Sequence, residues 1–160
     1  MNSQINKSKG PGVYIPPPLL YVLIFLASVF IQKKFPVSDL LFHRTIIKVV
    51  GVLFLVAALF FLMRSLRQFF LTKNTLILIK PASSLQTTGI YGITRNPMYV
   101  GLAFVYIGIA CFVGNWWTFI LLPFLILIIQ EYIIKREEKY LELEFEQAFR
   151  DYKKTVRRWL

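Results

Sequence analysis

Four apolar runs divide the chain, and polar or charged segments separate them. A helix needs about 20 residues, within a range of roughly 17–25, to cross the hydrocarbon core of a bilayer. Each run is expected to be helical because unpaired backbone groups are costly in lipid. The predicted spans are residues 17–32, 45–63, 98–114 and 116–134. The pattern therefore predicts an all-α, polytopic membrane protein with about four transmembrane helices.

The segment after the fourth run is strongly charged, but its apolar residues recur on one side of a helix. This stripe, spaced by three or four residues, contains Ile134, Glu138, Leu141, Phe145, Phe149, Tyr152 and Val156. The spacing predicts a cytoplasmic amphipathic helix over about residues 135–156. Glu131 lies seven residues before Glu138 and is expected on the same side. A carboxylate on a packed face is costly unless it is paired, so Glu131 is expected either to form an ion pair, with Arg95 or Lys135, or to contact a ligand.

The remaining segments are interpreted from their polarity and their turn-forming residues. Residues 1–15 are polar and are predicted to be a disordered tail, and residues 16–160 are predicted to form a single membrane domain. The second helix is expected to continue beyond the membrane, and the apolar segment 75–80 to lie extended at its surface. Gly114 and Asn115 predict a tight turn, and Pro123 is expected to kink the fourth helix.

Asn96 and Pro97 mark the start of the third span. Asn is among the best N-cap residues, and Pro is favoured at the first helical position. Arg95 and Asn96 are therefore expected at the positive end of the helix dipole, where backbone N–H groups favour an anion such as a carboxylate. Gly101 and Gly108 lie one heptad apart on this helix. They predict a face where either another helix or a ligand approaches the backbone closely.

Composition and charge favour a membrane, and not a nucleic acid, as the environment of this chain. Hydrophobic residues make up 56% of the sequence, above the roughly 45–50% apolar content of soluble proteins. The formal net charge is +11, but the cations gather in the loop before the third span and in the C-terminal tail. The positive-inside rule therefore places that loop and both termini in the cytoplasm. Four cations near the first connection fit this topology poorly: Lys33, Lys34, Arg44 and Lys48.

Few side chains in the sequence support metal-based or nucleophilic catalysis. The chain has one cysteine and one histidine, which are interpreted as a packing residue, Cys111, and a solvated loop residue, His43, so no metal site is expected. Rossmann, P-loop, zincin and esterase motifs are absent from the sequence. The polar groups expected near the start of the third span can hold a zwitterion, with its anionic end on arginine and its cationic end on a carboxylate and aromatic faces. These groups are Arg95, Tyr91, Tyr99, Glu137 and Glu138.

Two motifs in the second half of the chain resemble those of a family of integral-membrane methyltransferases, which includes isoprenylcysteine carboxyl methyltransferase and phospholipid N-methyltransferases. The stretch TGIYGITRNPMYVG, residues 88–101, is similar to the R(H/N)PxYxG signature of that family. The second motif begins at Glu137 and Glu138 and ends with the Arg-Arg-Trp of residues 157–159. The resemblance covers roughly residues 74–160 and is greatest to small bacterial members.

This resemblance implies that S-adenosylmethionine binds at the cytoplasmic face of a bacterial inner membrane. The acceptor arrives from the lipid and is an isoprenylcysteine-like carboxylate, an amino lipid or another small hydrophobic nucleophile. The cofactor-binding residues that the resemblance implies are Gly89, Tyr91, Arg95, Asn96, Pro97, Tyr99, Gly101, Glu137 and Glu138. Two of them are expected to be catalytic: Arg95 orients a carboxylate, and Glu138 contacts the cofactor's amino group or the nucleophile. These two side chains must then lie close together across a pocket that opens to the lipid.

The chain departs from the family pattern at two positions. Asn96 stands where many members have His, so this position is not expected to act as a base. Glu146 stands where Gly usually follows Phe145, so helix is expected in place of a turn. Two other functions stay open. One is an NADPH-dependent membrane reductase, since sterol reductases carry a similar Arg-His-Pro-x-Tyr element; the other is a non-enzymatic membrane scaffold.

Overall fold

The computed structural model describes residues 10–71 and 84–160, and the regular structure in these ranges is helical. In chain order the elements are α1 (Pro17–Lys34), η1 (Leu40–His43), α2 (Thr45–Leu71), η2 (Gly89–Gly92), α3 (Pro97–Val113), α4 (Trp116–Ile128), η3 (Ile129–Ile134) and α5 (Lys135–Thr155). The elements η1 and η2 are short 3-10 turns, whereas η3 is π-helical and joins α4 to α5. The all-α prediction is confirmed, as is the extension of the second helix. The predicted extended segment 75–80 lies outside the described residues.

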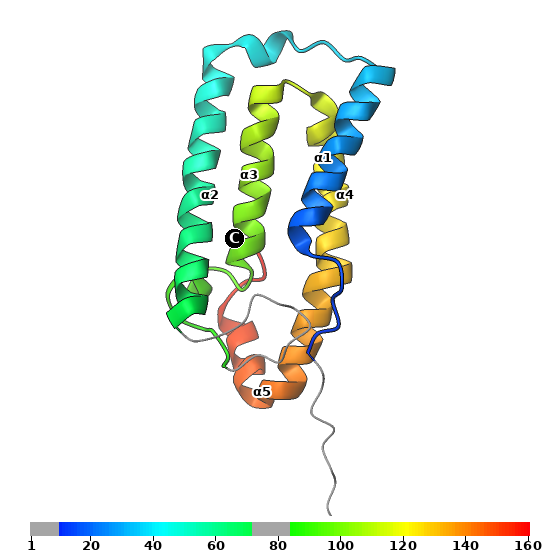
Figure 1. The fold of residues 1–160 in the computed structure, drawn as a ribbon. Coiled ribbons are helices and arrows are strands. Elements are labelled where there is room, and N and C mark those ends of the chain that lie inside the picture. Colours follow the sequence, from blue (N-terminus) through cyan, green and yellow to red (C-terminus); the bar gives the residue numbers. More distant parts are fainter. Residues whose placement is uncertain (1–9, 72–83) are drawn as a thin grey trace, which may run out of the picture.

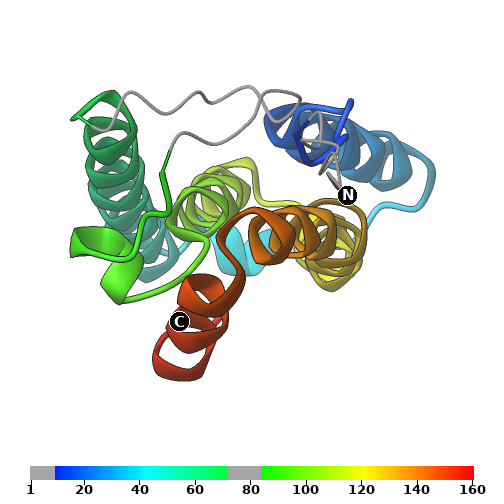
Figure 2. The ribbon, with the colours of Figure 1, turned by 90° about the horizontal axis from the view of Figure 1, so that it is seen from below.

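The long helices stand side by side in two pairs (Figure 1). Helix α2 packs along α3, and α1 packs against α4. Seen from below, α1 and α2 lie on the two sides of the bundle, and α5 lies across its lower end (Figure 2). The start of α1 and the whole of α5 therefore share one end of the bundle, while the α1–α2 and α3–α4 connections lie at the other.

The helices have the length and surface of membrane spans. Three helical stretches are long and apolar enough to cross a membrane: α1, α2 and the continuous run Trp116–Thr155. Helix α3 is apolar but has only 17 residues, the lower limit of the range of about 17–25 for a span. Large apolar side chains are exposed along α2, including Leu53 and Leu59, each 62% exposed. A continuous apolar surface of this kind is favourable against lipid, so the fold fits an integral membrane protein.

Glycine residues allow α2 and α3 to pack closely. A Cβ atom added to Gly108 would lie 2.7 Å from Leu55 Cγ, and one added to Gly101 would lie 2.8 Å from Leu62 Cγ. Cys111, farther along α3, is also buried. Of the two possibilities for the glycine face of α3, the structure shows helix packing, because α2 fills this face.

The junction between α4 and α5 differs from the α-helix that the sequence pattern assumes. Residues Ile129–Ile134 form a π-helical turn, which closes i→i+5 hydrogen bonds and therefore rotates the residues that follow it around the helix axis. Glu131 is exposed and pairs with Lys135, whereas Glu138 is buried. The prediction that the two carboxylates share a face is wrong, because it assumed about 3.6 residues per turn throughout. Of the alternatives left open for Glu131, the structure shows the ion pair with Lys135.

Helix α5 bends at Glu146, where φ is 41° and ψ is −113°. Glu146 is the one non-glycine residue with a positive φ in the part of the chain that the structure describes. After the bend, Tyr152 OH donates a hydrogen bond to Tyr91 O at 2.6 Å, so the second half of α5 contacts the loop before α3. The expectation of uninterrupted helix at this position is wrong. The chain turns at residue 146 although glycine is absent there.

Polar contacts close the end of the bundle that lies opposite α5. Gly114 has a left-handed φ of 70°, and Asn115 Oδ1 accepts a hydrogen bond from Trp117 N at 2.9 Å. Asn115 Nδ2 donates to Ser28 Oγ at 3.3 Å and so connects the start of α4 with α1. The tight turn predicted at residues 114–115 is confirmed.

The chain in front of α1 is packed against the bundle. Val13 is 2% exposed and belongs to an apolar cluster with Tyr21 and Ile133. Residues 1–9 of the predicted disordered tail lie outside the described part of the chain. The packed region thus begins before residue 16, because Val13 already contributes to the core.

Candidate active site

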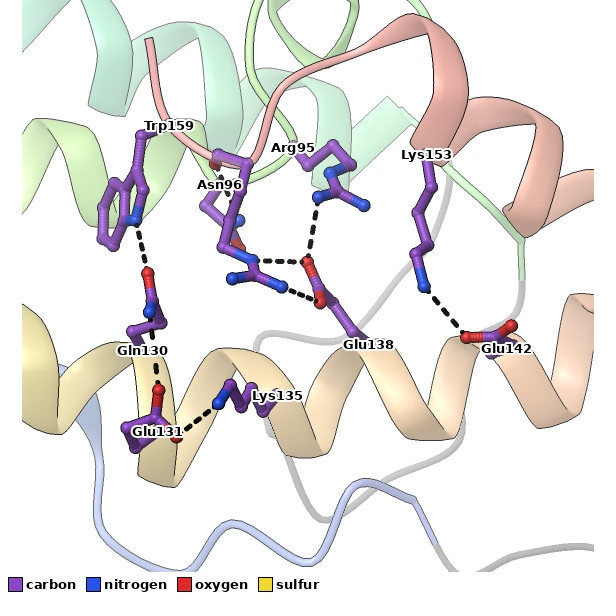
Figure 3. A network of polar contacts seen from close by, with 10 residues as sticks. Arg95, Asn96, Gln130, Glu131, Lys135, Glu138, Glu142, Lys153 and Trp159 are labelled. Carbon is purple, nitrogen blue, oxygen red and sulfur yellow. Dashed lines mark hydrogen bonds and ion pairs between the residues drawn. The ribbon is translucent and has the colours of Figure 1, made fainter.

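The end of the chain forms part of the candidate site. After α5, residues 156–160 run back past the loop that precedes α3, and we call these residues the C-terminal strap (Figure 3). Trp159 packs against the apolar core, and its Nε1 donates to Gln130 Oε1 at 3.2 Å. The strap is therefore anchored on η3.

Hydrogen bonds connect the strap to three consecutive loop residues. Arg95 N donates to Arg157 O at 2.9 Å. Thr94 Oγ1 and Asn96 Nδ2 both donate to Arg158 O, at 3.1 and 2.9 Å. These bonds fix the backbone on both sides of Arg95, directly before the start of α3.

Arg95 and Glu138 form a buried ion pair (Figure 3). Arg95 Nη2 lies 3.2 Å from Glu138 Oε1, and the two side chains are only 10% and 11% exposed. The predicted proximity of these residues is confirmed as a direct contact, whereas a pocket that opens to the lipid beside them stays a prediction. Arg158 binds the same carboxylate in a bidentate manner, from Nε to Oε1 at 2.9 Å and from Nη2 to Oε2 at 2.7 Å. Glu138 is therefore shared by two guanidinium groups.

Arg95 retains unused hydrogen-bond donors. Its Nε and Nη1 atoms are buried and have no hydrogen-bond partner within the described residues. A buried donor without a partner costs about 1–3 kcal/mol, and more when the group is charged. The two guanidinium groups also carry more charge than Glu138 neutralises. An anion at this position would satisfy both the donors and the charge.

Glu137 has a different environment from that of Glu138. Its Oε1 accepts a hydrogen bond from Tyr99 OH at 2.8 Å, and Glu137 is not among the residues that form ion pairs in the described chain. Burial raises the pKa of Glu137 to about 7, and the nearby charge of Glu138 contributes to this rise. A carboxyl group in such surroundings becomes more acidic again when a cation binds beside it.

Tyrosine residues bring three segments together around Glu137. Tyr21 OH of α1 donates to Tyr99 O at 3.1 Å, while the hydroxyl of Tyr99 contacts Glu137. Tyr91, in η2, is buried and lies close enough to Glu137 for an electrostatic interaction with it. Helix α1, the start of α3 and the start of α5 therefore meet at this point, beside η2.

Asn96 does not cap α3 in the expected way. Its side chain makes no hydrogen bond to the helix N-terminus, because Nδ2 is used to bind the strap at Arg158 O. Pro97 occupies the first helical position, as predicted. The first N–H groups of α3 are thus left without a cap from Asn96, as at any helix start that lacks one.

The other cofactor-binding residues that the resemblance implies do not all lie beside the Arg95–Glu138 ion pair. Pro97 is buried beside the loop. Gly89 has a φ of 62°, which favours glycine, and a Cβ atom added there would lie 3.6 Å from Gln68 Oε1. Gly101 faces α2 instead, on the side that Leu62 fills. The implied residues that contact one another or the strap are Arg95, Asn96, Tyr99, Glu137 and Glu138.

Two residues of the site are not among those implied by the sequence. Arg158 lies within the second motif, and this position could have marked it as a candidate. Neither its spacing nor its residue type indicates that its side chain binds Glu138. Tyr21 lies in the apolar first span and belongs to neither motif, so the sequence does not indicate that it is part of the site. Within the described ranges, no group of His, Cys, Asp and Glu residues is arranged to hold a metal ion.

Comparison with known proteins places the chain among the membrane methyltransferases. The model of the phospholipid methyltransferase family matches residues 45–148, and the chain belongs to this family. It is also similar to a Haemophilus influenzae protein named "Uncharacterized protein", with 38% identity over 63 residues, which is 39% of this chain and 100% of that protein. No solved structure matches the chain. The family match confirms the resemblance seen in the sequence motifs.

Proposed function

We propose that the protein transfers a methyl group from S-adenosylmethionine to a lipophilic acceptor in the membrane. The family supports methyl transfer, and the apolar helices support a membrane setting. The observation that carries the proposal is the buried ion pair between Arg95 and Glu138. This pair joins the two family motifs at the end of the bundle where α5 leaves the apolar helices. We place that end at the cytoplasmic face of a bacterial inner membrane.

The side chains at this point fit the charged end of the cofactor. Arg95 has two buried donors that are able to bind a carboxylate. Glu137 and the ring of Tyr99 offer negative charge and aromatic surface to cationic groups. The remaining residues of the first motif are assigned to the wall of the binding region or to its support: Gly89, Tyr91, Asn96, Pro97 and Gly101.

The protein contributes alignment and the exclusion of water. The cofactor supplies an activated methyl group, which an in-line nucleophile removes. Arg95 orients a carboxylate at the start of α3, and the strap keeps the Arg95 backbone in place through the bond from Arg95 N to Arg157 O. Holding the reactants in the correct geometry lowers the activation barrier, because the entropy cost of bringing them together is met when they bind. Burial of the site excludes competing water.

The acceptor is expected to reach the site from the lipid. An isoprenylcysteine-like carboxylate, an amino lipid and another hydrophobic nucleophile all suit this route. A protonated amine must lose a proton before it attacks, and Glu137, whose pKa burial raises to about 7 as long as no cation binds beside it, is suited to accept one. This property of Glu137 favours an amine among the three acceptor classes.

Ligand binding to detergent-purified protein tests the proposal. We expect S-adenosylmethionine to bind and NADPH not to bind. Arg95→Ala should weaken binding by roughly tenfold or more, because a hydrogen bond to a charged group contributes about 1.5–3 kcal/mol. Arg157→Ala is the matched control, since the Arg157 side chain is exposed and its backbone carbonyl is retained.

Mass spectrometry of lipid extracts incubated with the protein and methyl-labelled cofactor then tests the acceptor. Label in an amino lipid is the expected result. Binding of NADPH in place of S-adenosylmethionine would replace this proposal with a reductase. Folded protein that binds neither ligand would support a scaffold and overturn the enzymatic function.

A further inference from the structure

The carboxylate of Glu138 is largely occupied by the protein itself. Its Oε1 accepts from Arg158 Nε and lies 3.2 Å from Arg95 Nη2, and its Oε2 accepts from Arg158 Nη2 at 2.7 Å. A carboxylate offers about four acceptor positions, so these contacts use most of them. A ligand ammonium group would have to compete with two guanidinium groups that are already in place.

Arg158 connects α5 with the loop of the first motif. Its guanidinium group fixes Glu138, and its backbone oxygen accepts hydrogen bonds from Thr94 and Asn96. Bidentate arginine–carboxylate contacts are geometrically specific as well as strong. One strap residue thereby sets both the backbone position of the loop and the direction from which Glu138 meets Arg95.

We infer that Arg158 is a positioning residue, which holds Glu138 so that Glu138 orients Arg95 toward the anionic part of the ligand. This inference rests on the proposed function and refines it. Glu138 supports Arg95 and does not contact the cofactor's amino group. The two buried donors of Arg95 that have no partner among the described residues, Nε and Nη1, are then the groups that meet the ligand.

A double-mutant cycle separates this indirect role from direct contact. Glu138→Gln, Arg158→Gln and the double variant are compared with wild type for the dissociation constant of S-adenosylmethionine, well below the melting temperature of each protein. If Glu138 acts only together with Arg158, each single variant should bind about tenfold more weakly or worse, and the double variant should be no weaker than the weaker single variant. Arg158→Lys keeps the charge but loses the fork, so we expect partial recovery.

The matched control is a second ion pair formed by α5. Lys153 Nζ lies 3.1 Å from Glu142 Oε2, and these side chains are 35% and 37% exposed. Figure 3 shows this pair apart from Arg95. Lys153→Gln and Glu142→Gln should leave the dissociation constant within about twofold of wild type, because this pair lies outside the Arg95–Glu138–Arg158 cluster and ion pairs in contact with solvent contribute little.

Hydrogen exchange supplies a readout that does not depend on ligand. The amide of Arg95, bonded to Arg157 O, should exchange at least about tenfold faster in Arg158→Gln than in wild type. Unchanged exchange and unchanged affinity in Arg158→Gln would overturn the positioning role, as would additive losses in the cycle. If Arg158→Gln shows the faster exchange but wild-type protein binds no S-adenosylmethionine, the proposed function is overturned and the positioning role is retained.

Discussion

Replacement of Glu146 by glycine should stabilise the protein. Glu146 sits at the bend of α5 with φ 41° and ψ −113°, a conformation that glycine adopts freely and residues with a Cβ atom rarely adopt. Strained backbone of this kind costs about 1–3 kcal/mol. Glycine also makes the unfolded chain more flexible, which costs about 0.4–1 kcal/mol. The expected net gain in the free energy of unfolding is therefore at most about 2.5 kcal/mol and centres on roughly 1.3 kcal/mol.

Equilibrium unfolding of detergent-purified protein measures this gain, and two variants control for it. Glu146→Ala removes the same charge but keeps a Cβ atom, so it should give little or no stabilisation. Glu144→Gly introduces glycine at an exposed helical position before the bend, where it should cost roughly 0.5–1 kcal/mol. The reasoning fails if Glu146→Gly is destabilised as much as Glu144→Gly, because the backbone at Glu146 would then not be strained.

Three further predictions concern packing, protonation and the strap. Gly108→Val should lower the free energy of unfolding by about 1–3 kcal/mol, since an added Cβ lies 2.7 Å from Leu55 Cγ; wild-type stability would contradict the packing. Burial raises the pKa of Glu137 from 4.5 to about 7, so its contribution to stability should be fully present below about pH 4.5 and be lost as pH rises to about 7; unfolding of Glu137→Gln across the same pH range should lack this loss. Asn96→Asp should lower the free energy of unfolding by about 1–3 kcal/mol, because it removes the donor that Asn96 Nδ2 gives to Arg158 O at 2.9 Å. Asn96→His keeps a ring N–H donor, so it should lower the free energy of unfolding less.

The apolar pattern was sufficient to predict the helices because burial in lipid acts on long, continuous stretches. The spans, the turn at residues 114–115 and the proximity of Arg95 and Glu138 follow from hydropathy, from turn residues and from the resemblance. The use of Asn96 could not be predicted in this way. Its side chain fits a helix cap by local rules, but a carbonyl of the strap, brought close only by tertiary folding, takes its donor instead.

The same limit applies to the two conformational irregularities of the last helical run. Position 146 lacks the glycine that usually signals a turn, and the chain turns there nonetheless because the contact of Tyr152 with the loop holds the second half of α5 in place. Residue type predicts a turn only when the backbone preference of that residue is not outweighed by contacts made elsewhere in the fold. Here the contacts made beyond the bend outweigh a cost of about 1–3 kcal/mol.

The π-helical turn η3 determines which carboxylates belong to the site. In a regular α-helix, residues seven apart differ by only about 20° around the axis, so Glu131 and Glu138 would face the same way. A π turn accommodates about one extra residue, which changes this angle by roughly 100°. Glu131 consequently lies at the surface with Lys135, while Glu138 faces Arg95 and Arg158. Since π turns are frequent at functional sites, we interpret η3 as the element that separates a solvent-exposed ion pair from the buried cluster on which the proposed methyl transfer depends.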